Sequence, residues 1–136
     1  MFETFEHTAD LGLRIRANEL PALFADAARG LFSMIVPDLD SVRLVDELEF
    51  TIEGPVSELL LFDWLNELLY TYETRHLLFA QFEVQLSESG LRATARGEAC
   101  DDHRHQLDHE VKAITYHGLK LEPADDGWLA EVIVDI

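Results

Sequence analysis

The chain is poor in the residues that stabilise secreted proteins or bind nucleic acid. Cys100 is its single cysteine, so no disulfide can form within it. Lysine and arginine number only 10 against 27 acidic residues, which gives a net charge of −17. Such a charge repels phosphate backbones and anionic membranes. We therefore expect no direct nucleic acid binding, and any role on RNA would require a basic protein partner.

Long apolar runs are missing too. The most apolar region, Leu59 to Tyr72, is interrupted by Asp63, Asn66 and Glu67 and is too short to span a membrane. The N-terminus lacks the basic and then apolar pattern of a signal peptide, so we expect a soluble cytoplasmic protein. There is no Gly-rich phosphate loop and no Gly-x-Ser-x-Gly turn, so the sequence gives no support to nucleotide hydrolysis or acyl transfer.

The spacing of apolar residues predicts an α+β fold. With 136 residues and 48% hydrophobic content, the chain suits one folded domain, residues 1–136. The predicted order is strand, helix, strand, helix and then four strands, in a mainly antiparallel sheet with both helices on one side. Strands are expected at 11–17, 42–53, 79–87, 91–99, 111–121 and 128–136, and helices at 20–35, after an Asn18 N-cap, and 58–74.

A small polar segment, Glu6-His7-Thr8-Ala9-Asp10, leads into the first predicted strand. Loops that lead into rigid strands often carry functional side chains. The alternative is an ordinary turn in which Thr8 and Asp10 bond to nearby backbone. The residues of this segment by themselves leave both interpretations open.

The final predicted strand brings carboxylates together at the C-terminus. Alternation places Asp135 on the polar face and Ile136 on the apolar face, so Ile136 is expected to be buried. Its α-carboxylate would then lie beside the Asp135 side chain. With a third carboxylate such as Asp10, these groups would form the oxygen ligand set that hard cations prefer. The alternative is that Asp135 is simply the solvated end of a strand.

The segment from Cys100 to His109 offers a thiol together with three imidazoles, which could suggest zinc. Zinc sites need about four ligands in a tetrahedron, usually contributed by two separated pairs. Because these ligands are crowded into one stretch, the sequence favours a solvated polar loop.

Lys112 stands among apolar and small residues, shortly after Glu110. A lysine held against a sheet can pair with a carboxylate or contact a phosphate. Alternatively, Glu110 and Lys112 form a surface ion pair that contributes little to stability. The residues do not decide between the two.

Taken together, several segments resemble the archease family over essentially the whole chain. The segment Glu110-Val111-Lys112-Ala113-Ile114-Thr115-Tyr116-His117 is the most specific, and the others are Phe5-Glu6-His7-Thr8-Ala9-Asp10, Arg104-His105 and Asp135-Ile136. Three residues of the polar loop, Cys100, His103 and His109, do not match the family pattern.

The resemblance implies an accessory protein and not an enzyme. Archeases assist the GTP-dependent tRNA-splicing ligase by promoting its guanylylation and multiple turnover. The resemblance also implies a divalent-metal site, for calcium, formed by Asp10, Asp135 and Ile136. Ligase activation would depend on Asp10 and Lys112, with His7 and Glu110 beside them.

Two other functions remain as alternatives. The first is a general chaperone or adaptor of nucleic-acid enzymes that carries a structural metal. The second is a metal-dependent hydrolase in which Asp10 acts with His7 as the base.

Overall fold

The computed structural model describes residues 1–7 and 10–136, so the proposed turn bond of Thr8 lies outside the described residues. Within these ranges the chain forms strands, two α-helices and one short 3₁₀ helix. In chain order they are β1 (Phe2–His7), β2 (Asp10–Ala17), α1 (Leu20–Ile35), η1 (Leu39–Ser41), β3 (Asp46–Glu53), α2 (Glu58–Arg75), β4 (Leu77–Ser87), β5 (Gly90–Ala99), β6 (Ala113–Ala124) and β7 (Gly127–Asp135).

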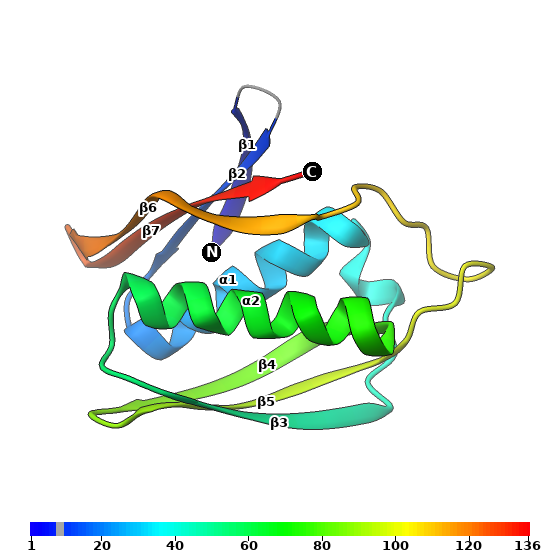
Figure 1. Ribbon diagram of the computed structural model, residues 1–136, viewed down its shortest axis with the longest axis horizontal. Coiled ribbons are helices and arrows are strands. Elements are labelled where there is room, and N and C mark those ends of the chain that lie inside the picture. Colours follow the sequence, from blue (N-terminus) through cyan, green and yellow to red (C-terminus); the bar gives the residue numbers. More distant parts are fainter. Residues whose placement is uncertain (8–9) are drawn as a thin grey trace.

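The strands pair into two antiparallel sheets, ordered β1-β2-β7-β6 and β3-β5-β4. Both helices lie between these sheets (Figure 1). The predicted α+β class and antiparallel pairing are confirmed, but the expected placement of both helices on one side of a single sheet is wrong. Each helix is apolar over a wide arc, and a second sheet is needed to bury that surface.

Strand β1 was not among the predicted strands, because its two phenylalanines lie on opposite faces and so break the apolar alternation. Phe2 packs against the core, whereas Phe5 lies on the outer face, opposite Gly12 of β2. A Cβ on Gly12 would come within 2.1 Å of the Phe5 ring, so the glycine makes room for that ring. The missing side chain thus lets the Phe5 ring lie directly over Gly12.

Several element boundaries differ from the predicted ones. Helix α1 has Glu19 and not Asn18 at its N-cap, without a side-chain cap bond. Strand β6 begins at Ala113, two residues later than predicted, so Glu110 and Lys112 precede the strand. The register of β6 against β7 also shifts between Thr115 and Lys120.

Several aromatic side chains lie within the otherwise aliphatic core between the sheets. Trp64 of α2 is fully buried, and its indole N–H donates to the Phe24 carbonyl of α1 at 3.0 Å. The Phe32 ring meets the Phe79 ring edge-on at 5.7 Å between centroids. Such edge-to-face pairs add to the stability that burial provides. They join both helices to the sheet β3-β5-β4.

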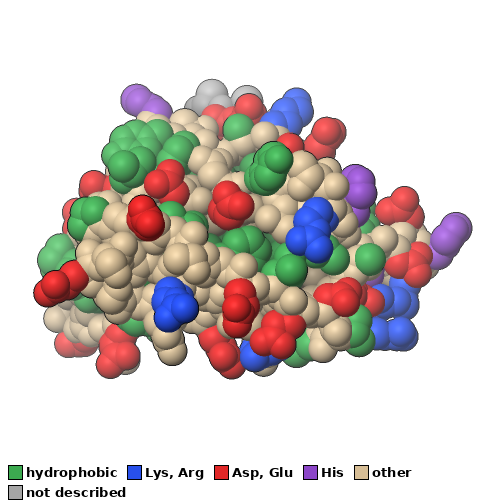
Figure 2. Space-filling view, turned by 60° about the horizontal axis from the view of Figure 1, so that its bottom comes forward, with side chains coloured by type: hydrophobic (Ala, Val, Ile, Leu, Met, Phe, Trp, Pro, Cys, Tyr) green, Lys and Arg blue, Asp and Glu red, His purple; other side chains and the backbone are tan. Residues whose placement is uncertain are grey.

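Acidic side chains are spread over the surface. Figure 2 shows them across the face it presents, with few lysines and arginines between them. In the described part of the chain, neither α-helix is long and apolar enough to cross a membrane.

Candidate functional site

A row of directly opposed residues crosses the sheet β1-β2-β7-β6 near one end. His7 pairs with Asp10, Asp10 pairs with Asp135, and Asp135 pairs with Ala113. Opposed residues of antiparallel strands share a face, and their Cβ atoms lie about 5 Å apart. The register therefore brings two aspartates, 125 positions apart in sequence, side by side on the outer face of the sheet.

Two carboxylates in such a cross-strand pair repel each other. In a chain of net charge −17 this repulsion is not offset by the general surroundings. A cation between the two side chains would remove it, and an oxygen-only donor set suits calcium or magnesium. The residues present therefore fit a divalent cation of this class. The structure places Asp10 as the first residue of β2, opposite His7, while residues 8–9, on which the turn interpretation also depends, lie outside the described residues.

The other residues implied at this site lie close to the aspartate pair. The His7 Nδ1 atom is 4.0 Å from the nearest Asp10 carboxylate oxygen. The Lys112 backbone N–H donates to the Asp135 carbonyl at 2.8 Å, and its side chain is exposed. Ile136 directly follows Asp135 and is half-buried against the core, less completely than predicted.

Side chains alone do not complete a metal site here. Among residues 1–7 and 10–136, no three His, Cys, Asp or Glu side chains are arranged to hold a metal ion. The predicted ligand set consists of two side chains and the α-carboxylate of Ile136, so it does not depend on a third side chain. Within the same residues, Glu110 and Lys112 form no ion pair, which removes the reason to regard them as a mere surface pair.

The outer face next to this row is fixed by Arg14. Its guanidinium lies 4.6 Å from the Phe5 ring centroid, and its Nε donates to Glu131 at 2.7 Å. A longer bond of 3.2 Å reaches Glu3. The hydrogen bond to Glu131 is the main cause of the raised pKa of Arg14, followed by the bond to Glu3. These contacts hold β1, β2 and β7 in register beside the aspartate pair.

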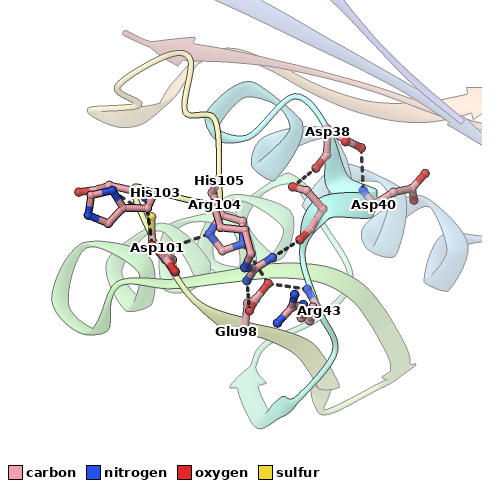
Figure 3. Close-up of polar contacts among 11 residues, drawn as sticks. Asp38, Asp40, Arg43, Glu98, Asp101, His103, Arg104 and His105 are labelled. Carbon is pink, nitrogen blue, oxygen red and sulfur yellow. Dashed lines mark hydrogen bonds and ion pairs between the residues drawn. The ribbon is translucent and has the colours of Figure 1, made fainter.

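A second polar cluster lies where β5 meets the following loop (Figure 3). The Glu98 carboxylate pairs with the Arg104 guanidinium and accepts the Arg43 backbone N–H at 2.6 Å. It also accepts His105 Nε2 at 2.9 Å. His105 Nδ1 in turn accepts the Asp101 backbone N–H at 2.9 Å. Because Nδ1 is an acceptor, the proton lies on Nε2 and points at Glu98.

Glu98 is only 7% exposed, and its carboxylate accepts hydrogen bonds from several neighbouring groups. Burial by itself raises the pKa of this carboxyl. The hydrogen bonds from Arg104, the Arg43 backbone and His105 outweigh burial and lower the pKa to about 2. The charged form is therefore strongly favoured at neutral pH.

The sequence does not indicate this cluster, because alternation along β5 would put Glu98 on the same face as Arg92, Thr94 and Arg96. The loop that follows β5 folds back over Glu98, which no local pattern indicates. The residues after Cys100 do form a loop, as predicted. His105 is committed to Glu98, whereas the exposed His103 bonds through its backbone to Asp101, so the loop's imidazoles serve different contacts.

Comparison with known proteins decides the family. The model of the archease protein family matches residues 2–136. The chain belongs to the archease family. Protein archease of Methanopyrus kandleri is 42% identical, over 99% of each chain. Protein archease of Pyrococcus furiosus is 38% identical, over 99% of this chain and 98% of its own.

Solved structures of the family share the fold. A solution structure of protein 1598 of Methanobacterium thermoautotrophicum is 33% identical, with a TM-score of 0.84 over 99% of this chain and 98% of its own. A crystal structure of an archease, possible chaperone, from Thermotoga maritima is 23% identical, with a TM-score of 0.69 over 100% of this chain and 98% of its own. The second likeness shows the fold alone.

Proposed function

We propose that this protein is an accessory activator of the GTP-dependent tRNA-splicing ligase, acting in the cytoplasm and carrying no catalytic nucleophile of its own. It would promote guanylylation of the ligase and so permit multiple turnovers. Membership of the archease family supports this proposal, together with the resemblance of its segments to residues implied in ligase activation.

The observation that carries the proposal is the direct pairing of Asp10 with Asp135. The carboxylates of Asp10 and Asp135, with the α-carboxylate of Ile136, would hold a divalent cation, for which we propose calcium. When bound, the cation supplies positive charge that fixes these carboxylates in place. Without a cation, their repulsion would leave the end of the sheet less well ordered.

Lys112 would provide the positive group that acts on the partner. Its backbone bond to Asp135 ties the lysine to the same strand end as the aspartate pair. The exposed ammonium can then reach a carboxylate or a phosphate of the ligase. His7 and Glu110 would act with Lys112 as supporting groups and not as ligands.

The test is a ligase assay with the purified partner. Substoichiometric amounts of this protein should raise the rate of ligase guanylylation and the number of turnovers. Asp10→Asn and Lys112→Met should each lose this effect, whereas Asp125→Asn, in an exposed turn, should keep it. Equal guanylylation rates with and without the protein would refute the proposal.

The same purified proteins can distinguish the proposed function from two others. The Thermotoga maritima structure carries the description of a possible chaperone, so a general chaperone or adaptor is the second candidate. It predicts stable recovery of other nucleic-acid enzymes and no stimulation of the ligase. A metal-dependent hydrolase would instead show phosphatase or nuclease activity that Asp10→Ala abolishes.

A further inference from the structure

A groove runs between the C-terminal part of α2 and the segment that leads into β6. Tyr72 and Glu73 of α2 form one wall, and the segment from Leu107 to Lys112 forms the other. Its volume of about 630 Å³ lies within the usual range of binding pockets, about 300–1,000 Å³. The Lys112 end joins the groove to the aspartate pair, because the Lys112 backbone bonds to Asp135.

The irregular wall of this groove is held in place by backbone hydrogen bonds. The Asp108 N–H donates to the Ile35 carbonyl at 2.9 Å, and the His109 N–H donates to the Met34 carbonyl at 3.0 Å. Upstream, the buried Glu98 cluster fixes the start of the same loop (Figure 3). A segment without regular structure that is fixed along its length is preorganised to bind, since little entropy remains to be lost.

The groove is negatively charged. Glu73, Asp108 and Glu110 line it with exposed side chains, and Lys112 is its one lysine. Within the described residues, no lysine or arginine forms an ion pair with these three carboxylates, and the one basic side chain paired with them is His109, whose Nε2 lies 3.6 Å from the Asp108 carboxylate. The pKa of Tyr72 is raised by burial first and then by negative charges that include Glu110. A positively charged occupant is therefore favoured, and a phosphate backbone is disfavoured.

The groove also offers apolar surface between these charges. Val111 is 5% exposed and closes the groove from the core side, whereas the Leu107 side chain is 40% exposed. Tyr72 is half-buried in the opposite wall. An apolar centre within a charged rim is the usual composition of a protein-binding surface.

We propose that this groove binds a segment of the ligase that carries lysine or arginine beside an apolar side chain. This inference rests on the proposed function and names the docking surface for it. Docking there would bring the ligase to Lys112 and to the aspartate pair, which lie at one end of the groove. The binding surface and the activating groups then meet at Glu110 and Lys112, whereas Glu73, Leu107 and Asp108 belong to the binding surface alone.

The test reverses two groove charges that lie outside the proposed activating set. Binding of the full chain to the purified ligase is measured for Glu73→Lys/Asp108→Lys and for a matched control, Glu49→Lys/Glu88→Lys, on the opposite sheet and its hairpin. The groove variant should raise Kd about tenfold or more at low salt, and the control less than about threefold. Added salt should reduce the difference in Kd between the groove variant and the control, because it screens exposed charges.

Milder variants of groove residues test the same surface in case the charge-reversal variant does not fold. Glu73→Gln/Asp108→Asn, which only removes the charges, should weaken binding to an intermediate degree. Leu107→Ser should weaken it without changing the salt dependence. Saturating amounts of each variant should still activate the ligase, because Asp10 and Lys112 are intact.

Equal Kd values for the groove and control variants would overturn the docking surface while leaving ligase activation intact. Loss of activation at saturation, with Kd unchanged, would also overturn it. A wild-type protein that binds and stimulates no ligase would refute the proposed function itself. A dimer of this chain that the groove variant dissociates would show that the groove takes a second copy instead.

Discussion

Two groups of carboxylates in this protein have opposite surroundings. Glu98 is buried and receives hydrogen bonds from Arg104, His105 and the Arg43 backbone. Asp10 and Asp135 are partly exposed and face each other across two strands. The Glu98 carboxylate is satisfied by the protein itself, whereas the repulsion between Asp10 and Asp135 would be offset by the divalent cation that we propose.

The difference separates a structural role from a binding role. A buried carboxylate with several donors stabilises the fold, and removing it leaves its partners without an acceptor. Two opposed carboxylates cost stability unless a ligand joins them. Glu98 should therefore contribute strongly to stability at neutral pH, whereas Asp10 should contribute favourably only when a divalent cation is present.

The largest effect is expected from Glu98→Gln. This change should lower the free energy of unfolding at pH 7 by about 3 to 5 kcal/mol, because it breaks a buried, hydrogen-bonded ion pair. Urea unfolding followed by circular dichroism measures it. Glu83→Gln, which breaks an exposed pair of 3.1 Å with Arg96, is the control and should cost less than about 1 kcal/mol. Equal losses of stability in Glu98→Gln and Glu83→Gln would contradict a special structural role for the buried carboxylate.

Acid should remove the contribution of Glu98. Its pKa is lowered from 4.5 to about 2 in the folded protein, so its stabilisation is present above pH 4.5 and is lost as pH falls through about 2. The shift corresponds to about 3 kcal/mol. Urea unfolding of the wild type and of Glu98→Gln between pH 7 and pH 2 should give curves that converge at low pH. A constant difference in stability between the wild type and Glu98→Gln over that range would show that the charge of Glu98 does not stabilise the folded protein.

Calcium should have a smaller effect, confined to the aspartate pair. At about 100 times its Kd, calcium should raise the free energy of unfolding by about 2.7 kcal/mol. Asp10→Asn should abolish this gain and Asp125→Asn should keep it, which thermal unfolding with and without calcium can measure.

Without calcium, Asp10→Asn should change the free energy of unfolding in the opposite direction. Asp10→Asn should then be more stable than the wild type by about 0.2 to 1 kcal/mol, because it removes one of two opposed charges. A variant that is destabilised equally with and without calcium would show that Asp10 acts in folding and not in metal binding.

The sequence predicted both helices and six strands because their apolar residues follow clear periods of 3.6 and 2. Those periods tell which face of an element is buried, but not which element covers it. The placement of α1 and α2 between two sheets was therefore missed. Strand β1 was not predicted for a local reason, since Phe2 and Phe5 point to opposite faces.

The candidate site shows the same division. The identities of Asp10, Asp135 and Lys112 could be obtained from the sequence, as could their positions, Asp10 just before a predicted strand and the other two within predicted strands. Their convergence came only from the strand order, which places β2 beside β7 and sets Asp10 opposite Asp135. The burial of Glu98 likewise depends on a loop that folds back over β5.

Composition, periodicity and motif thus determined the fold class, the acidity and the residues that carry the family resemblance. Only the tertiary structure decided which carboxylates meet, which one is buried and where a negatively charged groove forms. Periodicity depends on neighbours in the chain, whereas a register between residues 10 and 135 depends on how the whole sheet is assembled.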